Sequence, residues 1–297
     1  MRGLGARPLT FADANAPLKG AEFVLLGVPF DATSSFRPGA KFAPNAIREA
    51  SWNFETFNHQ HRIDIADIAI HDSGNLEDFA RVEDMQKEVH SAVDGILGNG
   101  SFPIVMGGEH SLTPGVLAAL RERQDFGAVV LDAHMDFRDE YLNLRGSHAC
   151  ATRRSSEIVG PEAIVPIGVR SVSRDEIEEI EKDFKGRFHY IDSYEVKRTG
   201  MGPAVKRALK WIGKRKIYLS LDTDALDPAF APGTGTPEPF GLTSWDVLEA
   251  VKLLAPRLVG FDIVEIAPNY DNGNTAALGA RIIREVIVAV HKAHASK

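Results

Sequence analysis

The stretch Gly127-Ala-Val-Val-Leu131, followed directly by Asp132-Ala-His-Met-Asp136, decides the fold class of this chain. The first five residues are apolar throughout, which is typical of a strand covered on both faces of a parallel sheet. Acidic residues and a histidine occupy every second position of the next five, so an extended backbone points them to one side. A buried strand that ends in such side chains indicates a site at the carboxyl edge of an α/β sheet.

Similar short apolar runs recur along the chain and alternate with segments of helical pattern. Apolar spacing predicts helices over Val82–Leu97 and Asn274–Ala295, and the capping residues Ser173 and Thr243 predict two more, ending at Gly186 and Leu254. This alternation indicates βαβ units and a mainly parallel sheet, either open or closed into a barrel. The eight predicted strands are Glu22–Val28, Ile65–Ile70, Pro103–Met106, Gly127–Leu131, Ile164–Val169, Arg187–Ile191, Lys216–Leu221 and Leu258–Val264.

Composition and charge narrow the class of protein. The net charge of −7 and the absence of a basic stripe argue against a nucleic-acid partner. No apolar run approaches the roughly 18 residues of a membrane span, residues 1–20 lack the apolar stretch of a signal peptide, and a single cysteine, Cys150, excludes an internal disulfide. We therefore expect a cytoplasmic protein without a membrane partner. No linker or repeat interrupts the 297 residues, so residues 1–297 are predicted to form one domain.

Three polar groups follow three separate predicted strands, at the edge where α/β sheets and barrels place their sites. The six side chains are those of Asp132, His134 and Asp136, of Asp222 and Asp224, and of His110. A lone histidine beside a glycine turn, or an isolated Asp-x-Asp, is usually structural or solvated. Three such groups on three strand ends instead predict a metal site, because four converging carboxylates repel one another unless cations lie between them.

The chemistry of these ligands indicates the ions and the type of reaction. Two divalent ions bring four positive charges, which balance four aspartates. Carboxylates and imidazoles without sulfur favour a fairly hard ion, so Mn²⁺ is expected, with Zn²⁺, Co²⁺ or Fe²⁺ as alternatives. A pair of ions about 3.5–4 Å apart lowers the pKa of a shared water and makes a hydroxide nucleophile. Signatures of other common chemistries, such as G-x-S-x-G, the Walker loop, G-x-G-x-x-G and H-E-x-x-H, are missing from the sequence.

Several motifs resemble those of the arginase/agmatinase (ureohydrolase) family, and they extend along nearly the full chain. They are Gly107-Gly-Glu-His-Ser111, Asp132-Ala-His-Met-Asp136, Ser220-Leu-Asp-Thr-Asp-Ala-Leu-Asp-Pro228, Ala231-Pro-Gly-Thr-Gly-Thr-Pro237 and Val264-Glu-Ile-Ala-Pro268, with Arg37-Pro-Gly39 and Pro44-x-x-Ile-Arg48 near the N-terminus. The resemblance implies a three-layer α/β/α fold with a central, mainly parallel eight-stranded sheet. It also implies a homo-trimer or homo-hexamer.

The resemblance further implies a role for each site residue. One ion would bind His110, Asp132, Asp136 and Asp222, and the other would bind Asp132, His134, Asp222 and Asp224. Asp132 and Asp222 would then bridge the two ions. Glu265 would hold the guanidinium of a small-molecule substrate, Asp136 would also orient the attacking hydroxide, and His148 would transfer the proton to the leaving amine. The implied reaction cleaves a guanidine to urea and an amine.

Agmatine, which would give putrescine, is the substrate that we expect. The segment Phe137-Arg-Asp-Glu140 departs from the Ile-Asn-Thr pattern of arginases, whereas Ser147-His-Ala-Cys150 and the proline-rich loop from Ala225 to Leu242 are similar to agmatinases. Many agmatinases have Gly-Thr in place of Ala149-Cys150. We expect Asp139 or Glu140 to attract the distal ammonium of agmatine, while Arg138 would suit a carboxylate instead.

Other substrates and one non-enzymatic function stay open at this point. The ureohydrolase alternatives are aminopropylagmatine, guanidinobutyrate or another guanidino acid, arginine and formiminoglutamate. A metal-binding scaffold without catalysis is disfavoured, because every implied ligand is present together with Glu265 and His148. A histone-deacetylase-like amidohydrolase is disfavoured by the second set of metal ligands.

Overall fold

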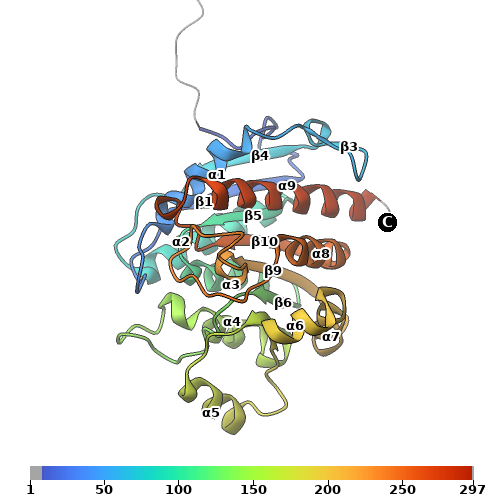
Figure 1. The fold of residues 1–297 in the computed structure, drawn as a ribbon. Coiled ribbons are helices and arrows are strands. Elements are labelled where there is room, and N and C mark those ends of the chain that lie inside the picture. The colour runs from blue at the N-terminus through green and yellow to red at the C-terminus, as the bar shows by residue number, and fades with distance from the viewer. Residues whose placement is uncertain (1–8, 296–297) are drawn as a thin grey trace, which may run out of the picture.

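An open sheet of eight parallel strands lies at the centre of the computed structural model, which describes residues 9–295 (Figure 1). The strand order is β4-β1-β5-β10-β9-β6-β7-β8, and every neighbouring pair is parallel. The strands are β1 Phe23–Val28, β4 Ile70–Asn75, β5 Phe102–Gly107, β6 Phe126–Leu131, β7 Ile164–Val169, β8 Ile191–Asp192, β9 Lys216–Asp222 and β10 Leu258–Val264. A separate antiparallel pair joins β2 Phe57–Asn58 to β3 Ile63–Asp64. The predicted fold class is confirmed, and the sheet does not close into a barrel.

Helices cover both faces of the sheet and give the molecule three layers. One face carries α1 Ala43–Ser51, α6 Ser193–Thr199, α7 Met201–Ile212, α8 Ser244–Leu254 and α9 Asn274–Ala295, and the other carries α2 Val82–Gly98, α3 Thr113–Arg121, α4 Ala151–Val159 and α5 Arg174–Asp183. Figure 1 shows α9, in red, near β1 and β5, in the half of the sheet that ends in β4. Within residues 9–295, no helix combines the length and the apolarity that a bilayer crossing requires.

The alternation of side chains along each strand explains the two helical layers. In β1, Phe23 and Leu25 pack into the core beneath α1 and α9, whereas Val24 and Leu26 pack into the core beneath α2 and α3. All six residues of β6 are buried, as the apolar run Gly127–Leu131 predicts. A strand with both faces covered has no polar face, so its apolar pattern is continuous rather than alternating.

Local capping accounts for two of the predicted helix starts. Ser173 and Glu176 form a reciprocal capping box at the start of α5, and Thr243 and Asp246 form another at the start of α8. Each cap satisfies amide groups that have no partner inside the helix, which stabilises the helix by about 1 kcal/mol. Both predictions of a helix start are confirmed, although α5 ends at Asp183, before the predicted stop at Gly186.

Two predicted strands are wrong in position. The strand predicted over Ile65–Ile70 begins only at Ile70, because the Asp64 side chain accepts a hydrogen bond from the Ala66 amide and caps a 3₁₀ turn over Ile65–Asp67. The strand predicted over Arg187–Ile191 consists of Ile191 and Asp192 alone. The amides of Arg187 and Phe188 both donate to the carbonyl of Phe184, which ties this segment into the turn that follows α5.

Four adjacent strands at the middle of the sheet, β5, β10, β9 and β6, end at one edge. Leu131 pairs with Leu221, and Val264 pairs with Asp222, so the carboxyl ends of these strands lie level with one another. These strand ends and the segments that follow them carry all six of the predicted ligands. The open parallel topology therefore brings together residues that lie more than a hundred positions apart in the sequence.

Gly108, in the loop after β5, packs tightly against the backbone of Phe30. A Cβ at this position would lie 1.9 Å from the Phe30 carbonyl oxygen. We expect Gly108→Ala to lower the free energy of unfolding by about 1–3 kcal/mol or more, since backbone atoms cannot move aside easily. Denaturant titration measures this change.

Gly95→Ala is the matched control, because its Cβ would meet nothing within 4 Å and the residue lies on the exposed side of α2. It should stabilise the protein by roughly 0.5–1 kcal/mol. Equal free energies of unfolding for the two variants would show that the close packing of Gly108 against the Phe30 backbone does not limit which residue this position accepts.

Candidate metal centre

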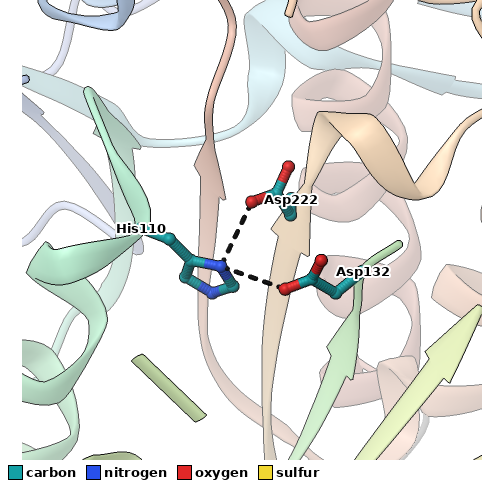
Figure 2. Close-up of side chains that lie close together, drawn as sticks. All are labelled: His110, Asp132 and Asp222. Carbon is teal, nitrogen blue, oxygen red and sulfur yellow. Dashed lines mark ion pairs between the residues drawn. The ribbon is translucent and has the colours of Figure 1, made fainter. Parts of the chain in front are cut away.

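His110, Asp132 and Asp222 converge from three different strand ends (Figure 2). The Nδ1 atom of His110 lies 3.2 Å from Asp132 Oδ2 and 3.2 Å from Asp222 Oδ2, and it lies 3.5 Å from Asp136 Oδ2. His110 is 1% exposed, and all three aspartates are buried. Oxygen and nitrogen atoms with lone pairs therefore face one small volume that solvent hardly reaches.

A second group of ligand atoms lies beside the first and shares Asp132 with it. Asp132, His134 and Asp224 each offer one ligand atom within 4.8 Å of the others. His134 Nδ1 lies 3.0 Å from Asp224 Oδ2 and 3.7 Å from Asp132 Oδ1. Because the two oxygens of Asp132 face different histidines, this carboxylate is placed between two adjacent clusters.

The ligand atoms are better arranged to bind cations than to form hydrogen bonds with one another. Within the described part of the chain, neither His110 Nδ1 nor Asp132 Oδ2 finds a hydrogen-bond partner, although both atoms are buried. Burial, followed by the charges of Asp136 and Asp224, raises the pKa of Asp132 to about 7. Burial and the neighbouring charges also raise the pKa of Asp222 well above its ordinary value. Divalent cations would remove this repulsion and satisfy the orphaned atoms.

Short turns aim the ligand oxygens. Asp132 Oδ1 accepts a hydrogen bond from the His134 amide at 2.6 Å, and Asp222 Oδ1 accepts one from the Asp224 amide at 2.9 Å. Each turn fixes one carboxylate oxygen and leaves Oδ2 facing His110. Asp224 Oδ1 in turn accepts from the Ala133 amide at 3.2 Å, which ties the loop after β9 to the loop after β6.

Two site residues have a left-handed backbone. Asp136 has a φ of 49° and Glu265 has a φ of 62°. Such a conformation costs a non-glycine residue roughly 1–3 kcal/mol, and it is typical of functional sites that the surrounding structure holds in place. Both side chains contact His110: Asp136 Oδ2 lies 3.5 Å from its Nδ1, and Glu265 Oε1 accepts a hydrogen bond from its amide.

A buried hydrogen-bonded chain behind His110 determines which ring nitrogen is free. Ser220 Oγ donates to Asp262 Oδ1 at 2.6 Å and lies 3.1 Å from His110 Nε2. Tyr218 and Thr113 donate to the other oxygen of Asp262. Because the only hydrogen of the Ser220 hydroxyl goes to Asp262, Ser220 must accept from Nε2–H. The lone pair of His110 is therefore on Nδ1, which faces the aspartates, as a metal ligand requires.

Glu265 lies at the end of β10, beside the ligand clusters. Its Oε1 accepts a hydrogen bond from the His110 amide at 2.8 Å, and its own amide donates to the carbonyl of Gly108. Burial, followed by the charge of Glu109, raises the pKa of Glu265 well above its ordinary value. A planar cation at this carboxylate would relieve both effects.

A cavity of about 250 Å³ opens onto the ligand clusters. Its wall includes His134, Asp136, Asp222 and Asp224, the predicted acid Glu265 and the predicted proton donor His148, together with Ser35, Met135, Arg138, Tyr141, Ala149, Ser171, Val172, Ser173, Glu176 and Thr236. His148 is half-buried, and its ring meets the ring of Tyr141 edge-on with centroids 6.1 Å apart. The structure thus brings all the predicted ligands, Glu265 and His148 to one place.

The outer part of the cavity differs from the sequence-based expectation. Asp139 pairs with Arg145 at 3.0 Å and with Arg154 at 2.8 Å, and Glu140 is exposed. Within the described residues, the cavity wall includes neither of these acids, so the structure does not support their proposed contact with a substrate ammonium. Arg138 does line the cavity, with one guanidinium nitrogen 3.8 Å from Glu176 Oε2.

Several residues of the site were assigned no role at the site from the sequence. Asp262 lies within an apolar strand, and Glu176 is visible in the sequence only as a helix cap. Thr236, in the long loop between β9 and α8, donates to Asp224 Oδ2 at 3.0 Å. Thr236 lies within the motif Ala231-Pro-Gly-Thr-Gly-Thr-Pro237, but the resemblance assigned no role to this residue.

The metal-free protein should lose stability as the pH rises. An unfolded aspartate has a pKa near 3.8, whereas the pKa of Asp132 in the folded protein is about 7. Between these values the folded state binds more protons than the unfolded chain, so the free energy of unfolding falls as the pH rises from about 4 to 7. Thermal melts in EDTA at pH 5, 6 and 7.5 should show a falling Tm.

Added Mn²⁺ should raise the Tm most at pH 7.5. When the free ion is at a hundred times its Kd, binding should raise the free energy of unfolding by about 2.7 kcal/mol per site. Asp132→Asn should lose both this gain and much of the pH dependence. A Tm that does not respond to Mn²⁺ at any pH would contradict the metal centre.

Comparison with known proteins agrees with this geometry. A model of the Arginase family matches residues 21–289. Agmatinase from Bacillus subtilis is 34% identical over 278 residues, which cover 92% of this chain and 93% of that protein. N(1)-aminopropylagmatine ureohydrolase from Thermococcus kodakarensis is 35% identical over 286 residues, which cover 92% of each chain.

The fold shows the same relationship. The crystal structure of agmatine ureohydrolase of Thermoplasma volcanium superposes with a TM-score of 0.92 at 40% sequence identity. The match covers 97% of this chain and 96% of that one. The family model, the relatives and the fold agree over nearly the same residues. The chain therefore belongs to the arginase family, within its agmatinase-type ureohydrolases.

Proposed function

We propose that this ureohydrolase binds two Mn²⁺ ions and hydrolyses agmatine to putrescine and urea. The observation that carries the proposal is the position of Asp132, whose two oxygens face two adjacent ligand clusters at the floor of a cavity. Glu265 and His148 lie in the wall of the same cavity. Zn²⁺, Co²⁺ or Fe²⁺ would also suit the ligands.

The proposed ligand sets follow the two clusters. His110, Asp132, Asp136 and Asp222 would hold one ion, and Asp132, His134, Asp222 and Asp224 would hold the other. The shared position of Asp132 supports its bridging role, while the second bridge, through Asp222, rests on the family resemblance. Two divalent cations in this position would activate water as a nucleophile and stabilise developing negative charge.

Glu265 is proposed to orient the guanidinium. One of its oxygens is held by the His110 amide, so the carboxylate cannot rotate freely. A guanidinium presents several N–H groups in one plane, and a fixed carboxylate can accept two of them in charge-assisted hydrogen bonds. This contact would place the guanidinium carbon over the ligand clusters.

His148 is proposed to protonate the leaving nitrogen. Addition of water makes the guanidinium carbon tetrahedral, and the bond from this carbon to the alkylated nitrogen then breaks. The nitrogen leaves as an amine and receives a proton, so that the guanidinium cation and one water give urea and one alkylammonium ion. General acid catalysis of this kind accelerates a reaction by about 10²–10⁴-fold.

The identity of the distal group of the substrate is the finer part of the proposal. Agmatine is supported by the agmatinase relatives and by Glu176, a buried carboxylate in the cavity wall. Arg138 in the same wall favours a second candidate, a guanidino acid whose carboxylate would pair with the guanidinium of Arg138. Aminopropylagmatine, the substrate that the Thermococcus relative is named for, would extend further from the cavity.

A substrate panel tests the proposed function. The Mn²⁺-loaded enzyme should release urea from agmatine with a higher kcat/KM than from 4-guanidinobutyrate, which has a similar length but the opposite terminal charge. Arginine, N1-aminopropylagmatine and formiminoglutamate complete the panel, and formamide is measured for the last. A higher kcat/KM for 4-guanidinobutyrate than for agmatine would show that the guanidino acid is the substrate instead. Full metal content without product from any compound would favour a scaffold.

Replacement of His148 separates proton transfer from metal binding. We expect His148→Ala to lower kcat by about 10²-fold or more, because the leaving nitrogen loses its acid. The metal content should stay at the wild-type value, since His148 belongs to neither ligand cluster. Wild-type turnover by this variant would show that His148 is not the proton donor.

Three further inferences from the sequence accompany this proposal. We infer a single domain over residues 1–297, of which residues 1–8 and 296–297 lie outside the described part. We also infer a homo-trimer or homo-hexamer and a cytoplasmic location. Sedimentation of the purified protein measures the oligomeric state.

A further inference from the structure

Thr33 connects a buried carboxylate to the ring of His148. The Thr33 hydroxyl donates to Glu109 Oε1, and the Thr33 amide donates to Glu109 Oε2 at 2.8 Å. The same hydroxyl oxygen accepts from the His148 amide at 3.0 Å and lies 3.2 Å from His148 Nδ1. Glu109 is fully buried, and Ser111 also donates to its Oε1, at 2.6 Å.

The number of available hydrogens fixes the direction of these hydrogen bonds. An ionised carboxylate only accepts, so Glu109 takes the single hydroxyl hydrogen of Thr33. The Thr33 oxygen then has only lone pairs left for His148, and it must accept from Nδ1–H. Ser147 Oγ lies farther from Nδ1, at 3.4 Å. The other ring nitrogen, Nε2, lies 3.4 Å from Ser35 Oγ, a residue of the cavity wall.

We propose that Thr33, held by Glu109, is a positioning residue that keeps the hydrogen of neutral His148 on Nδ1 and leaves Nε2 to exchange protons in the cavity. This inference rests on the proposed role of His148 as the proton donor. The hydrogen bond at one ring nitrogen sets which nitrogen of a histidine is protonated. Neither Thr33 nor Glu109 need touch the substrate for this purpose.

The chain Glu109–Thr33–His148 also fixes the position of the ring. His148 follows a loop with several exposed residues, Leu142, Asn143 and Leu144 among them. Its hydrogen-bond contacts with Thr33 and its edge-on contact with Tyr141 hold the ring at the cavity. If the Thr33 hydroxyl is lost, the ring should rotate and protonate on either nitrogen. Turnover should then fall, while the affinity for the substrate, which Glu265 provides, should not.

Three substitutions test this role through activity. Thr33→Val keeps the shape but removes the hydroxyl, and it should lower kcat about tenfold or more at unchanged KM and metal content. Thr33→Ser restores the hydroxyl and should return kcat to within about twofold of the wild type. Thr152→Val is the matched control, because Thr152 is also buried and, within residues 9–295, its hydroxyl has no hydrogen-bond partner. It should leave kcat unchanged.

Glu109→Gln tests the direction of the hydrogen bonds. The Thr33 amide can only donate, so the Gln oxygen must face it, and the Gln NH₂ group then faces the Thr33 hydroxyl. Thr33 would accept from this NH₂ group and donate to Nδ1 instead. We therefore expect the hydrogen of neutral His148 to move from Nδ1 to Nε2, and kcat to fall about tenfold or more.

Imidazole ¹⁵N NMR measures the tautomer without any reference to activity. The protein is loaded with diamagnetic Zn²⁺, and the His148 signals are assigned by their loss in His148→Asn. The wild type and Thr33→Ser should show a protonated Nδ1, and Glu109→Gln should show a protonated Nε2. A protonated Nε2 in the wild type would overturn the inference, as would wild-type kcat in Thr33→Val or an equal loss of kcat in Thr33→Ser. Failure of the wild type to release urea would overturn the proposed function alone, since the tautomer is read separately.

Discussion

The repulsion among buried carboxylates is the constraint on which this molecule depends. Four aspartates approach two histidines at the carboxyl ends of the central strands, where solvent hardly screens the charges of the buried carboxylates. The orphaned atoms of His110 and Asp132 face each other without a hydrogen bond. Such a cluster is unfavourable by itself and becomes favourable only around cations. The fold therefore has to hold the aspartates against their own repulsion, and much of the local structure does this.

Two turns and one hydrogen-bonded chain hold the ligands in place. Each fixes one atom of a side chain by a hydrogen bond and leaves another atom free. Turns at Asp132 and Asp222 fix Oδ1 and free Oδ2, and the chain Asp262–Ser220 fixes Nε2 of His110 and frees Nδ1. The Glu109–Thr33 pair would hold His148 in the same way, with Nδ1 fixed by a hydrogen bond and Nε2 free. Buried carboxylates thus serve both as ligands and as anchors for the imidazoles around them.

The fold class and the ligand cluster could be predicted from sequence because both depend on short-range patterns. Continuous apolar runs marked β6, β7 and β10, and ligands at every second residue marked the strand ends. The strands near Ile65 and Arg187 were misplaced because a capping aspartate and a turn overrode apolar character. Thr33 and Asp262 escaped notice, and Glu176 stood out only as a helix cap, because their roles at the site arise from contacts made across the fold. The structure does not support the expected role of Asp139, because this residue pairs with arginines of the next loop and helix and does not line the cavity.

The position of Asp132 between two ligand clusters is the central claim, and anomalous diffraction tests it most directly. Crystals grown with Mn²⁺ and measured near the manganese absorption edge should show two anomalous peaks per chain, about 3.5–4 Å apart, with one oxygen of Asp132 beside each. A single peak, or two peaks that do not share Asp132, would contradict this account of the site.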